Sequence, residues 1–219
     1  MIIFKPHTIF DIVRSYLPNN PTIVEAGAFD GRDTKKFLSY WPNGTIHAFE
    51  PVPTIFKKLV LNTINCPQVK CYPIALSNIN GTASFFVAEK TTTPGTPTQA
   101  GSLLTPKERL NHSPIHFPYT IQVPTITLDT WAYEQQITHI DMLWLDMQGY
   151  ELSVMQASPH LFATVKIIHT EVSFIESYAN QPQYPEVRTW LEGQGFTLLG
   201  TDFTQPPAWF FGNALFARI

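Results

Sequence analysis

Charge and cysteine are both scarce in this chain. Lys, Arg, Asp and Glu make up 14% of its 219 residues, where an average domain has about a quarter. The net charge is −3 and the basic residues form no cluster, which argues against a nucleic-acid backbone as the main partner. Cys66 and Cys71 are the only cysteines and have no Cys/His cluster around them, so we expect free thiols and no zinc site.

Long hydrophobic runs are absent as well. The apolar start of the chain is interrupted by Lys5-Pro6 and is too short for a signal peptide, and no stretch reaches the length of a membrane span. We therefore expect a cytoplasmic protein. Aromatic residues, at 13%, and 19 prolines are plentiful instead. They predict an apolar, proline-rich surface that suits sugars, lipids or a protein partner, and they leave the oligomeric state open.

The chain alternates apolar strand-like runs with amphipathic segments of helical period, which is typical of a parallel sheet. The first predicted strand begins at residue 22, and the others cover 45–50, 69–76, 82–88, 120–126, 141–146, 166–172, 196–200 and 209–217. The predicted helices cover 6–17, 32–41, 53–62, 128–136, 150–157 and 184–192. The last two strands are joined by Gln205-Pro-Pro207 and predict an antiparallel hairpin. We expect one α/β domain over residues 1–219, with an N-terminal helix within 1–20 and a doubly wound, mostly parallel sheet of about seven strands.

The stretch Thr22-Ile-Val-Glu-Ala-Gly-Ala-Phe-Asp-Gly31 reads as a strand, a tight turn and the start of a helix. Unpaired backbone N–H groups at such a helix start favour an anionic or polar ligand group. A dinucleotide fingerprint would need two further glycines, where this chain has Phe29 and Arg32, and a phosphate loop is absent too. The turn therefore predicts a cofactor site without a pyrophosphate, although any open α/β domain with a glycine turn would look the same.

Glu50 ends the second predicted strand, about twenty residues after the turn. An acid at this place can accept hydrogen bonds from both hydroxyls of a ribose. A ribose at Glu50 and an amino-acid end near the turn and Glu25 together fit S-adenosylmethionine. An NAD-linked enzyme is a weaker alternative, because the glycines are missing.

Several segments occur in the order and spacing of one family. They are Glu25-Ala-Gly-Ala-Phe-Asp-Gly31, Phe49-Glu-Pro51, Ala75-Leu-Ser77, Asp146-Met-Gln-Gly-Tyr-Glu151 and the strand that holds Glu171. Over about residues 20 to 200 the chain resembles the FkbM family of S-adenosylmethionine-dependent methyltransferases. The chain departs from the usual family residue at Phe29, Asn78 and Gln148, where the family often has Asn, Asp and Glu.

The resemblance implies a class I methyltransferase fold and a set of cofactor-binding positions. The positions that match the family's motifs are Glu25, Gly27, Ala28, Phe29, Gly31, Glu50, Pro51, Leu76, Ser77, Asn78 and Asp146. Leu76, Ser77 and Asn78 fall where the family binds adenine, but a turn with a polar flank would look identical.

Asp146 ends a strand at the crevice where open α/β sheets bind ligands, and it is our first candidate for the catalytic base. Glu171 is the second candidate, with His169 on the same face of its strand as an orienting partner or a core histidine. The turn Asp146-Met-Gln-Gly149 is not the Asp-Pro-Pro-Tyr type common in nitrogen methyltransferases, which favours an oxygen acceptor. A metal is not predicted as a ligand, although clustered carboxylates leave a divalent ion open.

Residues 91–118 are rich in Thr, Pro, Ser and Gly and show no period, so we expect a structureless loop within the segment 90–118. Its Ser102-Leu103 lies where family members carry a Ser-Leu segment near the substrate, which favours a lid. The sequence thus predicts an O-methyltransferase acting on a small hydroxyl compound, such as a sugar, a glycan or a secondary metabolite. A catalytically inactive binding module of the same fold is the alternative.

Overall fold

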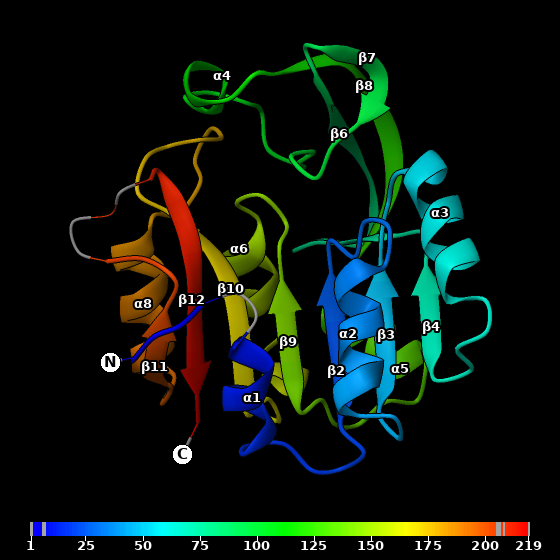
Figure 1. Ribbon diagram of the computed structural model, residues 1–219, viewed down its shortest axis with the longest axis vertical. Coiled ribbons are helices and arrows are strands. Elements are labelled where there is room, and N and C mark those ends of the chain that lie inside the picture. The colour runs from blue at the N-terminus through cyan, green and yellow to red at the C-terminus, as the bar shows by residue number, and fades with distance from the viewer. Residues whose placement is uncertain (1, 6–7, 205–206, 208, 219) are drawn as a thin grey trace.

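The structure is a computed structural model that describes residues 2–5, 8–204, 207 and 209–218. Within these residues eight strands form the main sheet: β1 Ile2–Ile3, β2 Thr22–Ala26, β3 Thr45–Phe49, β4 Val69–Tyr72, β9 Met142–Leu145, β10 Ile167–Ser173, β11 Thr197–Thr201 and β12 Phe211–Ala217. Their spatial order is β1-β11-β12-β10-β9-β2-β3-β4 (Figure 1). Only β12 runs antiparallel to its neighbours, β10 and β11. The expected mostly parallel sheet with a C-terminal antiparallel hairpin is confirmed.

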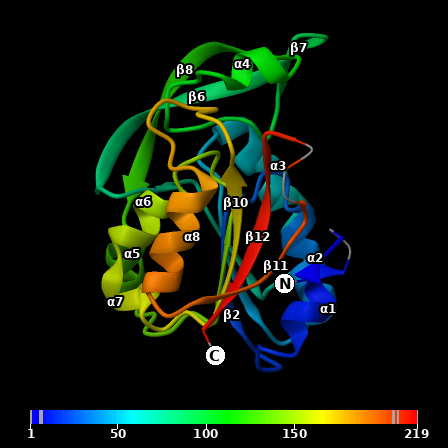
Figure 2. The same cartoon turned by 90° about the vertical axis from the view of Figure 1, so that its left-hand side faces the viewer.

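Helices cover both faces of the main sheet (Figure 2). One face carries α1 Ile9–Arg14, α2 Arg32–Tyr40 and α3 Pro53–Thr63, and the other carries α5 Leu128–Glu134, α6 Glu151–Gln156, α7 Pro159–Phe162 and α8 Tyr184–Gly193. The predicted helices are therefore present, with ends that differ by a few residues. Short α7 was not predicted. None of the helices in the described residues is both long and apolar enough to cross a membrane.

Each face of the sheet has its own hydrophobic core. On the α2 face, Phe37 is fully buried and packs edge-on against Phe10 and Trp144, with ring centroids 5.4 and 5.2 Å away. On the opposite face, Trp131 of α5 packs against Phe49, at 5.1 Å. The central strands β2 and β9 contribute to both cores, since their alternate side chains point to opposite faces. Burial on both faces explains why these strands read as continuous apolar runs in the sequence.

A second sheet lies above the carboxyl ends of the parallel strands (Figure 1). In the described chain it consists of β5 Ala75–Leu76, β6 Gly81–Lys90, β7 Thr93–Pro97 and β8 Ile115–Ile126, in the order β5-β8-β6-β7. The predicted strand 82–88 is confirmed as part of β6, which pairs antiparallel with β8 and β7. The predicted strand 69–76 is wrong at its end, because the chain leaves the main sheet after Tyr72 and Ala75–Leu76 join the second sheet.

The expected structureless loop over residues 91–118 is also wrong. This segment contains β7, the short helix α4 Arg109–His112 and the start of β8. The pairing of β6 with β7 is irregular, and buried Glu89 supports it by accepting a hydrogen bond from the Gly95 backbone at 2.6 Å. Other contacts of the segment join residues far apart in the sequence, such as the backbone hydrogen bond from Lys107 to Ser177, and leave no periodic pattern. Of the predicted Gln205-Pro-Pro207 turn, residues 205 and 206 lie outside the described residues.

Candidate functional site

The glycine turn after β2 fits against the end of β9. Gly27 and Ala28 donate backbone hydrogen bonds to the Phe49 carbonyl oxygen, at 3.1 and 3.0 Å, which ties the turn to the end of β3. Gly27 has a φ of 85°, and a Cβ at this position would lie 1.9 Å from the backbone oxygen of Asp146. Only glycine fits both the backbone angle and the space. The ends of three neighbouring strands therefore meet at Gly27.

A pocket with about 640 Å³ of empty space, its open mouth included, lies beside this junction. Its floor comes from the turn and the ends of β3 and β9, and its outer wall comes from the second sheet. The described residues that line it are Ala26, Gly27, Phe29, Phe49, Glu50, Pro51, Val52, Ile55, Ile74, Ala75, Leu76, Phe85, Val87, Ala88, Thr98, Gln99, Gly101, Leu103, Asp146, Met147 and Tyr150. Most of these side chains are apolar. The pocket thus suits a flat apolar group with a few polar contacts.

Glu50 is the buried acid of this pocket. Its Oε1 accepts a hydrogen bond from the Val52 backbone N–H at 2.8 Å. Burial raises the pKa of Glu50 to about 8, against the opposing effect of the backbone N–H groups of Val52 and Phe29. A carboxylate has about four acceptor positions, so Glu50 retains capacity for two ribose hydroxyls.

The predicted adenine positions are only partly at the pocket. Leu76 lines it and is buried. Ser77 is buried beside it and donates its backbone N–H to the Ile126 carbonyl. Asn78 is exposed, but its Oδ1 accepts a 2.8 Å hydrogen bond from the hydroxyl of Tyr150, which does line the pocket. Asn78 therefore acts on the pocket through Tyr150.

Glu25 lies at a second, polar cavity of about 650 Å³ that shares Gly27 and Asp146 with the first. Ala28 lines this polar cavity as well. Glu25 is buried and accepts a 2.5 Å hydrogen bond from Thr34, and burial raises its pKa to about 8. An apolar pocket that continues into a polar one fits a nucleoside joined to an amino acid, which is the composition of S-adenosylmethionine.

Gly31 lies apart from these cavities. It has a φ of 82° at the start of α2, and a Cβ there would lie 2.9 Å from Leu59 and 3.3 Å from Thr63 of α3. Its position indicates a role in helix packing. Among the predicted cofactor residues, the structure brings together Glu25, Gly27, Ala28, Phe29, Glu50, Pro51, Leu76 and Asp146 at the two cavities.

Asp146 and Glu171 are joined by the side-chain amide of Gln148. Its Nε2 lies 2.7 Å from Asp146 Oδ1 and 3.1 Å from both carboxylate oxygens of Glu171. Gln148 itself is buried and has a φ of 55°, which the turn before α6 imposes. An amide can donate to both carboxylates, whereas a Glu at this position would add a third acid. Gln148 thus sets the separation of the two candidate bases.

These two carboxylates differ in proton affinity. Burial raises the pKa of Asp146 to about 6, opposed by the Gln148 hydrogen bond. Burial also raises the pKa of Glu171 well above its usual value, and the nearby charges of Asp146 and Glu151 raise it further. Near neutral pH Asp146 is therefore the ionised member of the pair. Glu151 caps the turn instead, since its Oε1 accepts from the Met147 and Gly149 backbone at 2.8 and 3.3 Å.

His169 does not orient Glu171 by a hydrogen bond in the described structure. Its ring stacks on Trp144 with centroids 3.6 Å apart, and its Nδ1 is buried with no partner among the described residues. Burial lowers the pKa of His169 to about 3, so the ring is neutral at physiological pH. His169 lines a third cavity that also reaches Asp146.

Tyr178 and Ser102 connect the second sheet to this acid pair, and no motif in the sequence pointed to Tyr178. The Tyr178 hydroxyl donates to the Ala100 carbonyl at 2.6 Å and lies 3.1 Å from Gln148 Oε1. Ser102 is fully buried and its hydroxyl donates to the Gln148 carbonyl at 2.9 Å. The two residues tie the segment after β7 to the end of β9.

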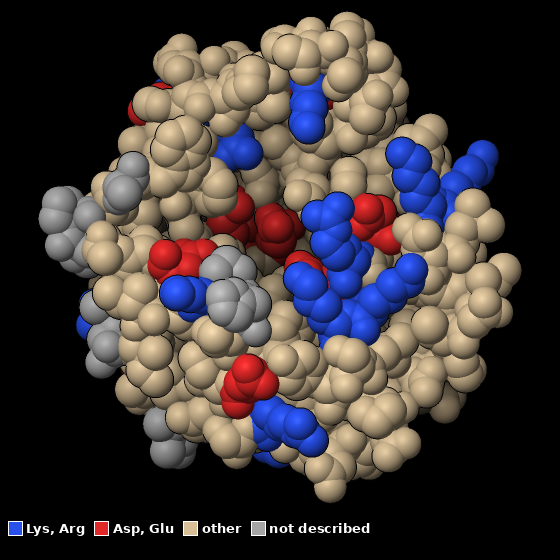
Figure 3. All heavy atoms as spheres, viewed as in Figure 1, with Lys and Arg blue, Asp and Glu red and all other residues tan. Residues whose placement is uncertain are grey.

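One face of the molecule is hollowed above the sheet, with acidic side chains at the bottom of the hollow and basic side chains at its rim (Figure 3). Within the described residues, no group of three His, Cys, Asp or Glu side chains is arranged to hold a metal ion.

Known proteins resemble the chain in both sequence and fold. A family model described as the methyltransferase FkbM domain matches residues 25–198. The 2-O-methyltransferase NoeI of Sinorhizobium fredii (strain NBRC 101917 / NGR234) is 29% identical over 163 residues, which cover 74% of this chain and 67% of NoeI.

Two solved structures share the fold at low identity. A putative rRNA methylase from Clostridium thermocellum has a TM-score of 0.57 at 12% identity and covers 100% of this chain and 98% of its own. SMU.1697c, a putative methyltransferase from Streptococcus mutans in complex with S-adenosylhomocysteine, has a TM-score of 0.54 at 11% identity and covers both chains completely. At these identities the likeness concerns the fold alone.

Replacing Gly27 by Ala tests the junction of the strand ends. The added methyl group would displace the Asp146 backbone, so we expect S-adenosylhomocysteine affinity to fall at least ~10-fold, together with a loss of ~1–3 kcal/mol of stability. Calorimetric titration and thermal unfolding measure the two effects. Gly193→Ala is the control, since a Cβ there meets nothing within 4 Å. Normal binding by Gly27→Ala would show that the close approach is not required.

Cofactor binding should release a proton from Glu50. The free carboxyl, with a pKa of about 8, is protonated at pH 7, and ribose hydroxyls that donate to it would favour the ionised form. We therefore expect S-adenosylhomocysteine affinity to rise from pH 6 to pH 8 and to be lost as the pH falls. Titration calorimetry in two buffers of different ionisation enthalpy measures the released protons.

Glu50→Gln is the matched variant for this test. It should fold normally, because the wild-type side chain is itself neutral when buried at pH 7, and it should bind roughly 1–3 kcal/mol more weakly. The number of protons released on cofactor binding should fall by the amount that Glu50 contributes in the wild type. Equal release by wild type and variant would remove Glu50 from the ribose site.

Proposed function

The chain belongs to the FkbM family of S-adenosylmethionine-dependent methyltransferases, and on this premise we propose that it methylates a hydroxyl oxygen of a sugar or glycan unit. The observation that carries the proposal is the position of Asp146, a half-buried carboxylate shared by the cofactor pocket and the polar cavities beside it. A hydroxyl acceptor needs such a base, because it must lose its proton as it attacks. The rhizobial relative named as a 2-O-methyltransferase supports oxygen as the acceptor atom.

The cofactor would be held by residues at both ends of the joined cavities. Glu50 would bind the ribose hydroxyls of the cofactor, and Leu76 and Met147 would enclose its adenine ring. Glu25 would face the amino-acid end. When bound, S-adenosylmethionine supplies an electrophilic methyl group on a sulfonium sulfur. The protein's contribution is then to orient the acceptor, exclude water and accept a proton.

Asp146 is the residue we assign to proton transfer. It is ionised near neutral pH, while burial and the neighbouring charge keep a proton on Glu171. The side-chain amide of Gln148 holds the Asp146 carboxylate in place through a 2.7 Å hydrogen bond. The acceptor's O–H proton would pass to the Asp146 carboxylate as the oxygen forms its bond to the methyl carbon, while the carbon–sulfur bond would break and S-adenosylhomocysteine would leave.

The segment 90–118 would cover the acceptor side of the site. Its Leu103 lines the cofactor pocket, and Ser102 anchors it to the end of β9. We propose that this segment, folded as β7, α4 and the start of β8, excludes water and shapes the acceptor site.

The proposed function can be tested with purified protein, S-adenosylmethionine and a panel of mono- and oligosaccharides. We expect S-adenosylhomocysteine to form with at least one sugar and the product to carry a methyl ether, identified by mass spectrometry and NMR. Nitrogen-bearing acceptors of similar size are the controls. Cofactor binding without turnover on every acceptor would favour the inactive binding module, and methylation of a nitrogen would overturn the oxygen acceptor.

The pH dependence of turnover distinguishes the two candidate bases. Asp146 must be ionised to act, so kcat should fall as the pH drops through about 6, its pKa. Asp146→Asn should lower kcat by roughly 10² to 10⁴ with little change in cofactor affinity, since the shape is retained. Glu171→Gln should cost less, because that carboxyl is already protonated. A dead Glu171→Gln variant beside an active Asp146→Asn variant would reverse the assignment.

A further inference from the structure

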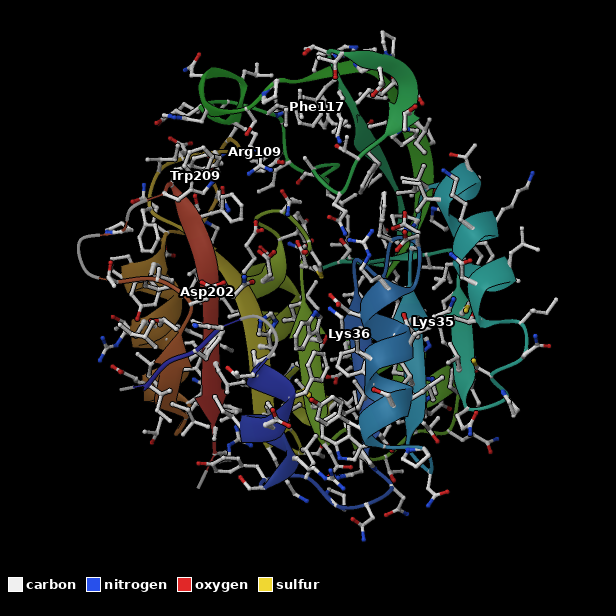
Figure 4. The ribbon with its side chains drawn as sticks, in the orientation of Figure 1. Lys35, Lys36, Arg109, Phe117, Asp202 and Trp209 are labelled. Carbon is white, nitrogen blue, oxygen red and sulfur yellow. The ribbon has the colours of Figure 1, made fainter. Side chains whose placement is uncertain are left out.

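Arg109 is a partly buried cation that has no ion pair with an acid among the described residues. Its side chain extends from α4 toward the hollow, beside the labelled Trp209 (Figure 4). The guanidinium carbon lies 5.2 Å from the ring centroids of both Phe210 and Phe211, which hold it by cation–π contact. Its Nε is buried and has no hydrogen-bond partner among the described residues.

Several other basic side chains of the described chain have acidic partners. Lys36 contacts Asp33, Lys107 contacts Glu176 and Arg32 lies 3.8 Å from Asp30. Arg109 forms no ion pair with any acid of the described chain. An anionic ligand group would accept a hydrogen bond from the buried Nε of this half-buried guanidinium and pair with its charge.

The charges of Arg109, Asp146 and Glu171 define an orientation for the acceptor. Arg109 is close enough to oppose the raised proton affinity of both carboxyls, yet it does not contact them. The hollow in Figure 3 likewise has basic side chains at its rim and acidic side chains at its bottom. An acceptor that carries a hydroxyl at one end and an anionic group at the other matches this arrangement.

Trp209 adds an apolar surface beside the guanidinium. Its indole is 54% exposed and packs on Phe210 with centroids 4.9 Å apart. Exposed aromatic rings of this size offer a flat face to the apolar side of a sugar ring.

We propose that Arg109 and Trp209 form the acceptor-recognition subsite and that the acceptor is an acidic sugar. Its carboxylate or phosphate ester would bind the guanidinium through two parallel N–H···O bonds, while a hydroxyl points inward to Asp146. A neutral sugar would fill the same space but leave the cation without a counter-ion. This proposal rests on the proposed sugar methylation and specifies that the sugar is acidic.

Matched acceptors that differ only at carbon 6 of one hexose test the subsite. They are a methyl hexoside, the corresponding methyl uronoside and the 6-phosphate, so the last two distinguish a carboxylate from a phosphate. We expect kcat/KM of the wild-type protein to favour one acidic sugar over the neutral one at least ~10-fold, mainly through KM. Equal or better use of the neutral sugar would overturn the proposal.

Arg109→Gln should reduce this preference by ~10- to 100-fold, which is the effect of losing a charge-assisted pair. Lys107→Gln is the matched control: it removes the same charge two residues away, from an exposed ion pair with Glu176. The control should retain the full preference. Equal loss in both variants would mean a general charge effect and would overturn the subsite.

A binding measurement separates this proposal from the proposed reaction. Saturation-transfer NMR of the methyl uronoside and the 6-phosphate, with S-adenosylhomocysteine present, reports acceptor binding without turnover. Binding by wild type and by Lys107→Gln, but not by Arg109→Gln, would support the subsite even if no sugar were methylated, and only the reaction would then be wrong. If the wild-type protein bound neither of the two acidic sugars, the proposed subsite would be overturned.

Discussion

The contact between Gly27 and the Asp146 backbone is the constraint on which the site depends. β2 and β9 are neighbours at the centre of a parallel sheet, so their carboxyl ends meet at one edge. A side chain at Gly27 would overlap the Asp146 carbonyl, and its absence lets the two strand ends approach. This approach makes Asp146 a shared wall of the apolar and polar cavities. The cofactor pocket and the candidate base are therefore positioned by the same contact.

The fold buries several carboxyl groups around this junction, and their environments differ. Glu25 has Thr34 as a partner, Glu50 has the Val52 backbone, and Glu151 caps a turn. Removal from water raises the pKa of each. Such burial costs stability unless a ligand or a hydrogen bond compensates, which is typical of functional sites. The graded proton affinities allow one acid to bind a ligand while another accepts a proton.

The second sheet converts an open crevice into an enclosed site. It supplies the outer wall of the cofactor pocket and carries Arg109 above the acids on α4. Ser102 and Tyr178 connect it to Gln148, which holds Asp146 and Glu171. The second sheet and the two carboxyl groups are therefore joined through one amide side chain. The α/β layers below it provide the rigid support that such positioning needs.

The sequence by itself determined where the parallel strands and the covering helices lie along the chain, together with the central part of the cofactor site. These features have local causes: helical and strand periods, a glycine turn, and an acid directly after a strand. Parallel pairing of Ala26 with Phe49 then brings the Gly27 turn and Glu50 together. Only the tertiary structure decided the second sheet, the amide bridge of Gln148 and the unpaired charge of Arg109. Their partners are distant in the sequence, and burial, which sets the proton affinities, depends on segments that meet only in the folded chain.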